Sequence, residues 1–151
     1  MSAKKAVFLL GRTILGSFFV YSGIHHFQNR KSMAEYAGAK KVPLPEVAVL
    51  GTGALMVAGG ASLILGMRPR LGALAIVGVL PGVSPMMHDF WKMEDPNQRM
   101  QEMINFTKNM ALAGSALALM GVDEWPASIA AEESDTRRLA RQCASWRRSN
   151  V

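Results

Sequence analysis

Four long apolar runs dominate this chain of 151 residues and constrain its fold more than any other feature: Ala6–Phe27, Val47–Met67, Leu71–Met87 and about Met103–Val122. Each run approaches the roughly 20 residues that an α-helix needs to cross a hydrocarbon core of about 30 Å. In the second run only Thr52 and Ser62 carry polar side chains, whereas helices of soluble proteins normally have a polar face. We therefore predict an all-α, four-span integral membrane protein rather than a soluble protein with buried helices.

The four runs leave little sequence for a separate soluble domain. We expect residues 1–122 to form a four-helix bundle and residues 123–151 to form a polar, basic tail. The start, MSAKK before an apolar run, is similar to a secretory signal. Arg12 interrupts that run, however, and no cleavage site of small residues closes it. We expect an uncleaved first span.

The connections between the runs carry their own signals. Arg68-Pro69-Arg70 predicts a tight turn, so spans two and three should be antiparallel neighbours. Met33–Ala37 is suited to a short interfacial helix, and Asp95-Pro96 to the N-cap and first turn of the last helix. Lys and Arg near span ends favour the cytoplasmic side. This rule places the N-terminus, the tight turn and the tail inside (N-in, C-in), and the two longer connections outside.

Charge and small residues indicate the partners. The net charge is +6, and the basic residues cluster beside the spans, so we expect anionic lipid head groups rather than nucleic acid as their partner. The single Cys143 excludes an intramolecular disulfide. Small residues recur every fourth position and predict close helix contacts, within the bundle or between subunits: Ala54, Ala58, Ser62 and Gly66, then Gly78 and Gly82, then Gly114 and Ala118.

Ionisable residues inside or at the ends of the apolar runs are the candidates for function, because a charge at membrane depth costs about 2.5 kcal/mol or more. At 100° per residue, one stripe of the first helix holds Arg12, Gly16, Phe19, Gly23 and His26, whereas His25 points elsewhere. Span one ends, span three ends and span four begins on the same side of the membrane. We therefore predict a polar site at that side, formed by His26, His88, Asp89, Asn105, Lys108 and Asn109. Arg12 should lie about 20 Å away along the helix axis.

Several chemistries and one purely structural interpretation remain open for this cluster. Arg12 and Lys108 can extend toward head groups, and Asp89 can simply neutralise Lys108. His26, His88 and Asp89 form a weak two-histidine, one-carboxylate metal set, and no haem, flavin or stronger metal motif is evident. A quinone head group needs polar partners for its two oxygens beside apolar walls. A quinone fits the cluster better than a metal ion does, because aromatic residues flank the cluster: Phe27, Phe90, Trp91 and Phe106.

The chain also resembles a known family, the DoxX family, over about Ala6–Gly121. Six short motifs carry the resemblance together, in order and with compatible spacing: Gly11-Arg12, Ser22-Gly23 before His26-Phe27, Val42-Pro43-Leu44-Pro45, Arg68-Pro69-Arg70-Leu71-Gly72, His88-Asp89-Phe90-Trp91 and Phe106-Thr107-Lys108-Asn109. The family often has lysine where this chain has His26.

The resemblance implies a small four-helix protein of the bacterial inner membrane. Family members are similar to the membrane subunit of a thiosulfate:quinone oxidoreductase, and others are linked to membrane oxidoreductase complexes that handle thiol or oxidative stress. Carried over by position, the pocket would be lined by Arg12, His26, His88, Asp89, Lys108 and Asn109.

These observations favour a membrane subunit of a quinone-linked oxidoreductase, and leave open whether the chain is itself catalytic. In this hypothesis His26 or His88 handles protons, and Lys108 stabilises a reduced oxygen anion. The alternative is a non-catalytic accessory subunit that stabilises a larger membrane complex or self-associates, as the small-residue faces favour. A small transporter suits the prolines of span three, but no inverted repeat is evident.

Overall fold

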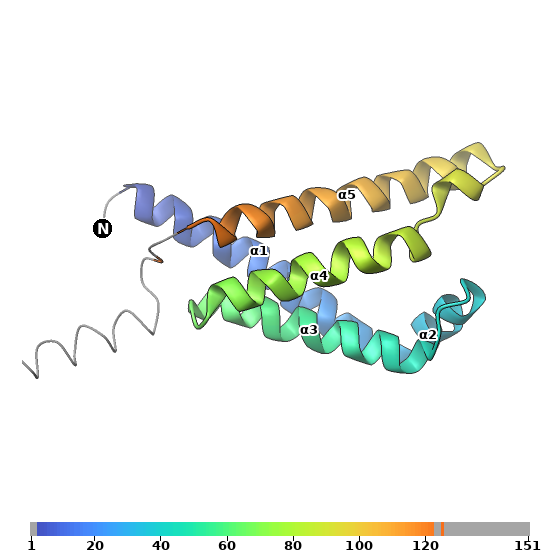
Figure 1. The fold of residues 1–151 in the computed structure, drawn as a ribbon, viewed down its shortest axis with the longest axis horizontal. Helices are drawn as coiled ribbons and strands as arrows, with labels where there is room; N and C mark the ends of the chain where they lie inside the picture. The colour runs from blue at the N-terminus through green and yellow to red at the C-terminus, as the bar shows by residue number, and fades with distance from the viewer. Residues whose placement is uncertain (1–2, 123–124, 126–151) are drawn as a thin grey trace, which may run out of the picture.

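The computed structural model describes residues 3–122 and 125, and this part of the chain is all-α. Four long helices run side by side (Figure 1): α1 (Ala3–Gln28), α3 (Pro45–Leu65), α4 (Pro69–Met87) and α5 (Pro96–Met120). A short helix, α2 (Arg30–Ala39), follows α1, and a 3-10 turn, η1 (Phe90–Lys92), follows α4. The helices cover the four predicted runs, and α2 contains the predicted interfacial segment. The predicted basic tail, residues 123–151, lies outside the described residues except for Trp125.

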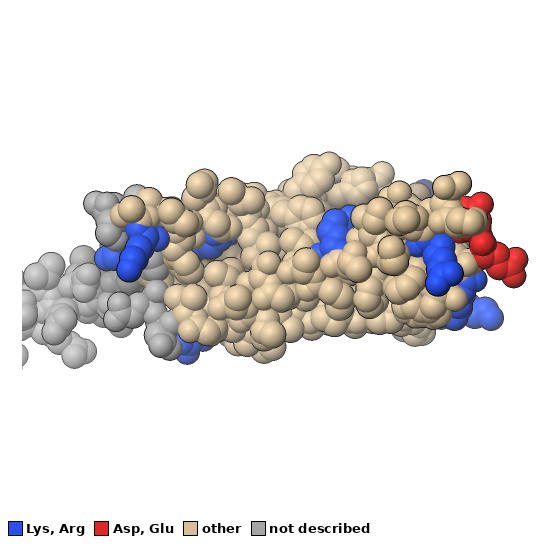
Figure 2. All heavy atoms as spheres, turned by 90° about the horizontal axis from the view of Figure 1, so that it is seen from above, with Lys and Arg blue, Asp and Glu red and all other residues tan. Residues whose placement is uncertain are grey.

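Three of the helices are long and apolar enough to cross a membrane: Ala3–Gln28, Pro45–Leu65 and Pro69–Lys92, which counts η1 with α4. The first half of α5 is more polar, since it contains Arg99, Glu102 and Lys108. Figure 2 shows the consequence on one face of the molecule, where most coloured charges gather toward the two ends and uncharged residues cover most of the length between them. The all-α fold is confirmed for the described residues, three of these helices could span a membrane, and the fourth span stays a prediction.

Local chemistry explains where the helices begin and end. The side chain of Asp95 accepts a hydrogen bond from the backbone N–H of Gln98 at 2.8 Å, so it caps α5 as predicted. Gly66 ends α3 with a φ of 69°, a left-handed conformation that glycine adopts without a Cβ clash. Pro69 then opens α4, with only Met67 and Arg68 between it and Gly66. The predicted tight turn between antiparallel neighbours is confirmed.

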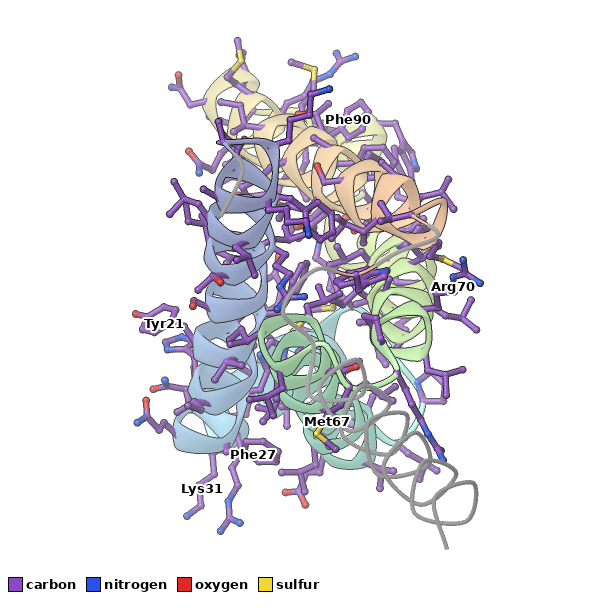
Figure 3. The ribbon with its side chains drawn as sticks, turned by 90° about the vertical axis from the view of Figure 1, so that its left-hand side faces the viewer. Tyr21, Phe27, Lys31, Met67, Arg70 and Phe90 are labelled. Atoms are coloured by element: carbon purple, nitrogen blue, oxygen red, sulfur yellow. The ribbon has the colours of Figure 1, made fainter. Side chains whose placement is uncertain are left out.

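The helices pack in a fixed order. α1 lies against α3, α3 against α4, and α4 against α5, while α2 folds back onto α3. Seen end-on in Figure 3, α1 and α4 lie on opposite sides of α3. Because successive long helices alternate in direction, the end of α1, the end of α4 and the start of α5 meet at one end of the molecule, together with α2 (Figure 1). We call this the α2 end.

Glycines allow the backbones of α1 and α3 to touch. A Cβ added to Gly16 would lie 2.7 Å from the carbonyl oxygen of Gly60, and one added to Gly23 would lie 2.5 Å from that of Gly53. Both pairs are spaced by seven residues along their helices, so the two contacts lie on one face of each. Phe19, which is fully buried, lies between them on α1. This arrangement fixes the depth at which α1 sits against α3.

The small-residue contacts predicted from fourfold spacing are mostly wrong within the chain. Ala54 and Ala58 are exposed, and a Cβ on Gly78, Gly82 or Gly114 would meet nothing within 4 Å. Of the first set, Ser62 lies at a helix contact, beside Gly72 of α4, and Gly66 is buried at the C-cap of α3. In a chain rich in glycine and alanine, small residues are spaced by four on several faces of a helix. The face that packs against a neighbour here is not the one predicted.

We predict opposite effects for two glycine substitutions. Gly23→Ala should destabilise the bundle by about 1–3 kcal/mol, since its Cβ meets backbone of α3 that cannot move freely. Gly78→Ala has open space and should instead stabilise the helix by roughly 0.5–1 kcal/mol. Unfolding of both variants in mixed detergent, followed by circular dichroism, measures the difference. Equal stability of the two variants would contradict the contact.

Candidate functional site

A cavity of about 330 Å³ lies at the α2 end, between the end of α1, α2, α3 and the last turns of α4. Its walls are mainly apolar: Met33, Ala37, Val42, Ala48, Val49, Val83, Met86 and Met87. Four residues with polar side chains complete the lining: His26, Ser32, Tyr36 and Thr52. An apolar cavity with a few polar groups is the usual form of a small-molecule site.

His26 is the predicted site residue that lines this cavity. Its Nδ1 lies 2.7 Å from the backbone carbonyl oxygen of Ser22, and a carbonyl only accepts, so Nδ1 donates. In a neutral ring the remaining nitrogen, Nε2, therefore carries a lone pair. The predicted stripe of α1 is confirmed, because the buried residues of that helix are Arg12, Gly16, Phe19 and Gly23. His25 is exposed, as predicted, and contacts Asn29.

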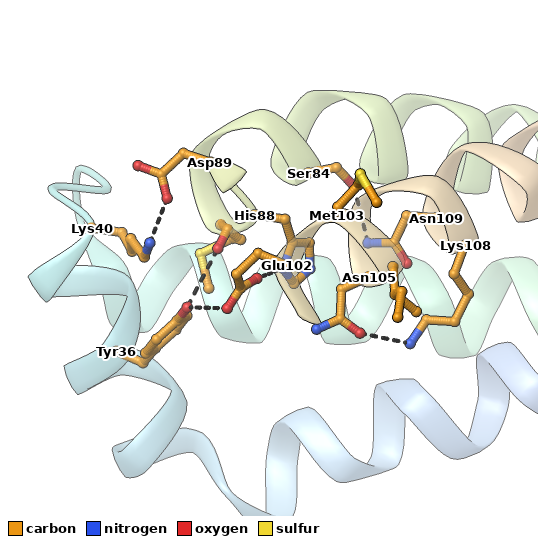
Figure 4. A network of polar contacts seen from close by, with 12 residues as sticks. Tyr36, Lys40, Ser84, His88, Asp89, Glu102, Met103, Asn105, Lys108 and Asn109 are labelled. Carbon is orange, nitrogen blue, oxygen red and sulfur yellow. Dashed lines mark hydrogen bonds and ion pairs between the residues drawn. The ribbon is translucent and has the colours of Figure 1, made fainter. Parts of the chain in front are cut away.

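A second group joins three helices at the same end (Figure 4). Nδ1 of His88, just after α4, lies 2.7 Å from Oε2 of Glu102 on α5. The hydroxyl of Tyr36 on α2 is 3.4 Å from Oε1 of the same carboxylate, and also 3.4 Å from the backbone carbonyl oxygen of Met87. Burial, followed by the negative charge of Glu102, raises the pKa of Tyr36 above its usual value. Tyr36 therefore stays a neutral phenol across the physiological range.

An ion pair ties the end of α2 to the segment after α4. Nζ of Lys40 lies 2.5 Å from Oδ1 of Asp89, and both side chains are largely shielded, with exposed fractions of 16% and 13%. Lys92 lies 3.4 Å from the other oxygen of Asp89. The hydrogen bond to Asp89 raises the pKa of Lys40 above its usual value. Asp89 is thus neutralised by Lys40 and Lys92, and not by Lys108, the partner in the purely structural interpretation.

The predicted residues of α5 make two hydrogen bonds, one across to α4 and one within α5. Asn109 donates to the hydroxyl of Ser84 at 3.0 Å, which satisfies a polar group that is almost completely buried on α4. Lys108 donates to Asn105 one turn earlier, at 3.2 Å. Arg12 stands apart, as predicted, and its guanidinium lies 5.6 Å from the centre of the Trp125 ring. Arg12 is itself 3% exposed.

The predicted set therefore divides in two. His26 belongs to the cavity, and His88, Asp89, Asn105, Lys108 and Asn109 belong to a polar region along the end of α4 and the first half of α5. Within the described residues no group of three His, Cys, Asp or Glu side chains is arranged to hold a metal ion. The metal set of His26, His88 and Asp89 is accordingly not assembled in this part of the chain.

Three residues of the site were missed by the sequence reasoning: Tyr36, Lys40 and Glu102. Glu102 lies three residues before Asn105, on the same face of α5, so its helical position was a usable signal. Tyr36 and Lys40 lie one turn apart on α2, which also places them on one face. Their partners on α4 and α5 follow only from how α2 folds back.

Comparison with known proteins identifies the family. The family model for DoxX matches residues 7–89, which is more than half of the chain. The chain belongs to the DoxX family. The matched DoxX region runs from α1 to just beyond α4 and contains every residue that lines the cavity, whereas α5 lies outside it. No match was found among curated proteins, and none among solved structures.

The Lys40–Asp89 pair generates a prediction for the docking of α2. Lys40→Met should weaken this docking by roughly 1 kcal/mol, so amide hydrogens of residues 30–39 should exchange about fivefold faster. Lys41→Met is the matched control, since Lys41 is exposed. Because the folded-state pKa of Lys40 is raised above 10.5, the pair's contribution is present below that pH and is lost as pH rises through the raised value.

Hydrogen exchange at about pH 6 and about pH 9 tests this pH dependence. The difference in exchange rate between wild type and Lys40→Met should be the same at both pH values. If Lys41→Met accelerates exchange as much as Lys40→Met does, the ion pair does not hold α2.

Proposed function

We propose that this DoxX protein is a membrane subunit of a quinone-linked oxidoreductase or related redox complex, and that its cavity binds a quinone-like molecule. The DoxX family is linked to roles associated with membrane oxidoreductases. The single observation that carries the proposal is the apolar cavity at the α2 end, with His26 in its wall.

The cavity suits such a molecule in size and chemistry. Its volume of about 330 Å³ is at the lower end of the range for ligand pockets, enough for one ring system and the first part of an apolar tail. Met33, Met86 and Met87 contribute flexible thioethers, which make favourable contacts with aromatic rings. A quinone, when bound, supplies the capacity to carry electrons together with protons.

His26 is the residue that we assign to the oxygen atoms of the ligand. Because Ser22 holds Nδ1–H, a neutral His26 accepts a hydrogen bond at Nε2 from a hydroxyl group. A protonated His26 instead donates from Nε2 to a carbonyl oxygen. The same ring therefore suits both the oxidised and the reduced form of a quinone. The cavity lining does not include Lys108, so a role in stabilising an oxygen anion requires an approach from outside this cavity.

We further propose that the protein lies in the bacterial inner membrane with four spans, N-in and C-in, and with the α2 end outside. The length and apolar surface of α1, α3 and α4 support a membrane location. α4 is helical throughout Pro69–Met87, including Pro81 and Pro85, so span three is continuous and the argument for a transporter weakens.

The second candidate, a non-catalytic accessory subunit, is favoured by the unused small-residue positions. Gly78 and Gly82 on α4 and Gly114 on α5 have open space around them. Glycine lets a second helix approach closely in lipid, so these positions suit a partner subunit or a second copy of the chain. Membrane lipids are the other expected partner of the apolar surface.

Filling the cavity tests the proposed function. Val49 is 6% exposed and lines the cavity, whereas Val47, on the same helix, is 64% exposed. We expect Val49→Phe to weaken binding of a short-chain benzoquinone by at least about tenfold, since the larger side chain occupies the site. Val47→Phe should bind like wild type. Calorimetric titration of each protein in nanodiscs, with thermal stability as a check on folding, gives the result.

The proposal is wrong if folded wild type binds no quinone, or if the two variants bind equally well. Co-purification of the chain with a larger assembly, together with an empty cavity, would support the accessory subunit instead.

Accessibility of single cysteines tests the topology. In a Cys143→Ser background, Lys31→Cys on α2 should react with a membrane-impermeant maleimide in intact cells, because Lys31 is exposed at the α2 end. Met67→Cys at the opposite turn, where Met67 is 50% exposed, should react only after the membrane is permeabilised. The reverse pattern would show that the α2 end is cytoplasmic.

A further inference from the structure

Tyr36 belongs both to the cavity wall and to the hydrogen-bonded group at the α2 end. It lines the cavity, and its hydroxyl hydrogen-bonds to Glu102, which lies on a different helix. In Figure 4 the Tyr36 oxygen points at Glu102, and Glu102 in turn points at His88. A continuous series of hydrogen-bonded groups therefore runs from the cavity wall to the outer side of α4 and α5.

All three side chains of this series reach the surface of the α2 end: Tyr36 is 42% exposed, and His88 and Glu102 are 22% and 18% exposed. The proposed topology places this end at the aqueous interface. The carboxylate uses Oε2 for His88 and Oε1 for Tyr36, so both of its oxygens are engaged. When Glu102 is ionised, Nδ1–H of His88 donates to it. His88 thereby holds the carboxylate in its acceptor form, with Oε1 directed at Tyr36.

We propose that Tyr36 and Glu102 carry a proton from a hydroxyl-bearing ligand in the cavity to water at the α2 end, with His88 as the positioning residue. The inference rests on the proposed function and deepens it, because it assigns the reduced, hydroxyl-bearing form of the ligand to this path.

The proton transfer balances without a further reactant. The ligand O–H bond breaks as its proton passes to the Tyr36 oxygen, while the O–H bond of Tyr36 breaks and its proton passes to Oε1 of Glu102. Tyr36 thus remains a neutral phenol, Glu102 becomes a carboxylic acid, and the ligand keeps the electron pair as an oxyanion. Glu102 then gives its proton to water. Reversal of these steps delivers a proton to an oxyanion in the cavity.

Other titratable groups surround this path, and the experiment must distinguish their effects on binding from that of Glu102. Lys40 and Asp89 face Tyr36 from α2 and the segment after α4, and they are paired with each other. Lys92 contacts Asp89. His26 lines the cavity from α1, so its own titration affects binding as well. Binding is therefore compared at about pH 5.5 and about pH 4. The Glu102→Gln variant shows whether a difference between the two conditions depends on that carboxylate.

The experiment measures binding of two probes to the full chain in zwitterionic nanodiscs, by calorimetry under nitrogen. The first probe is prenylhydroquinone, and the second is its dimethyl ether, which has no proton to give. We expect wild type to bind the hydroquinone about threefold more weakly at about pH 4 than at about pH 5.5, because a protonated Glu102 no longer accepts the proton of Tyr36 in the same way as a carboxylate. The ether should bind equally at both pH values, which also shows that the fold survives.

Matched variants locate the effect. Glu102→Gln and Tyr36→Phe should remove the pH dependence of hydroquinone binding, so that in each variant the ratio of hydroquinone affinity to ether affinity is the same at both pH values. Glu35→Gln and Tyr21→Phe are the controls, since both residues are exposed, Tyr21 at 71%, and Tyr21 points away from the bundle (Figure 3). Both controls should keep the wild-type pH dependence.

His88 is tested by its effect on the pH profile. His88→Phe removes the donor to Glu102 and should move the midpoint of the profile to higher pH, whereas His88→Gln, whose amide donates, should restore it toward wild type.

The outcomes separate the two proposals. If neither probe binds, the proposed function fails, and this inference fails with it. If both probes bind but the hydroquinone shows no pH dependence, or Glu102→Gln keeps it, the ligand site stands and the proton path is wrong.

Discussion

The backbone contact between α1 and α3 is the constraint on which the rest of the structure depends. Gly16 and Gly23 face Gly60 and Gly53 so closely that a single added Cβ has no room. In lipid, helices gain little from burying apolar groups against each other, so close packing and interhelical contacts must hold them together. The contact also places His26, because a Cβ on Gly53 would lie 2.8 Å from the Cβ of His26. The position of the cavity wall therefore follows from two glycine pairs.

Helix α2 completes the site by folding back over the end of the bundle. Apolar packing of Ala34 and Ala37 near Val49 holds its inner face. Its polar face reaches α4 and α5 through Tyr36 and Lys40, whose partners are a carboxylate each. Charged groups are tolerated here because they are paired and lie near the ends of the long helices. In the proposed proton path, the same polar contacts that dock α2 also connect the cavity with the aqueous phase.

Sequence reasoning predicted the elements well and their contacts only in part. The apolar runs predicted the long helices, and Asp95 predicted a cap, because both signals are local. The stripe of α1 that contains His26 was predicted because helical periodicity alone decides it. Pairings across helices were not: Asp89 binds Lys40 rather than Lys108, and Glu102 went unnoticed. Several partners were equally compatible with the sequence, and only the docking of α2 selects among them.

Photoaffinity labelling tests the central claim most directly, namely that the cavity beneath α2 is a site for a quinone-like molecule. The protein in native lipid is illuminated with an azidoquinone, digested and examined by mass spectrometry. The account predicts labels on residues of the cavity wall such as Met33, Met86 and Met87, and loss of those labels when unmodified quinone competes. Labels spread over the lipid-facing surface, with no competition by quinone, would contradict it.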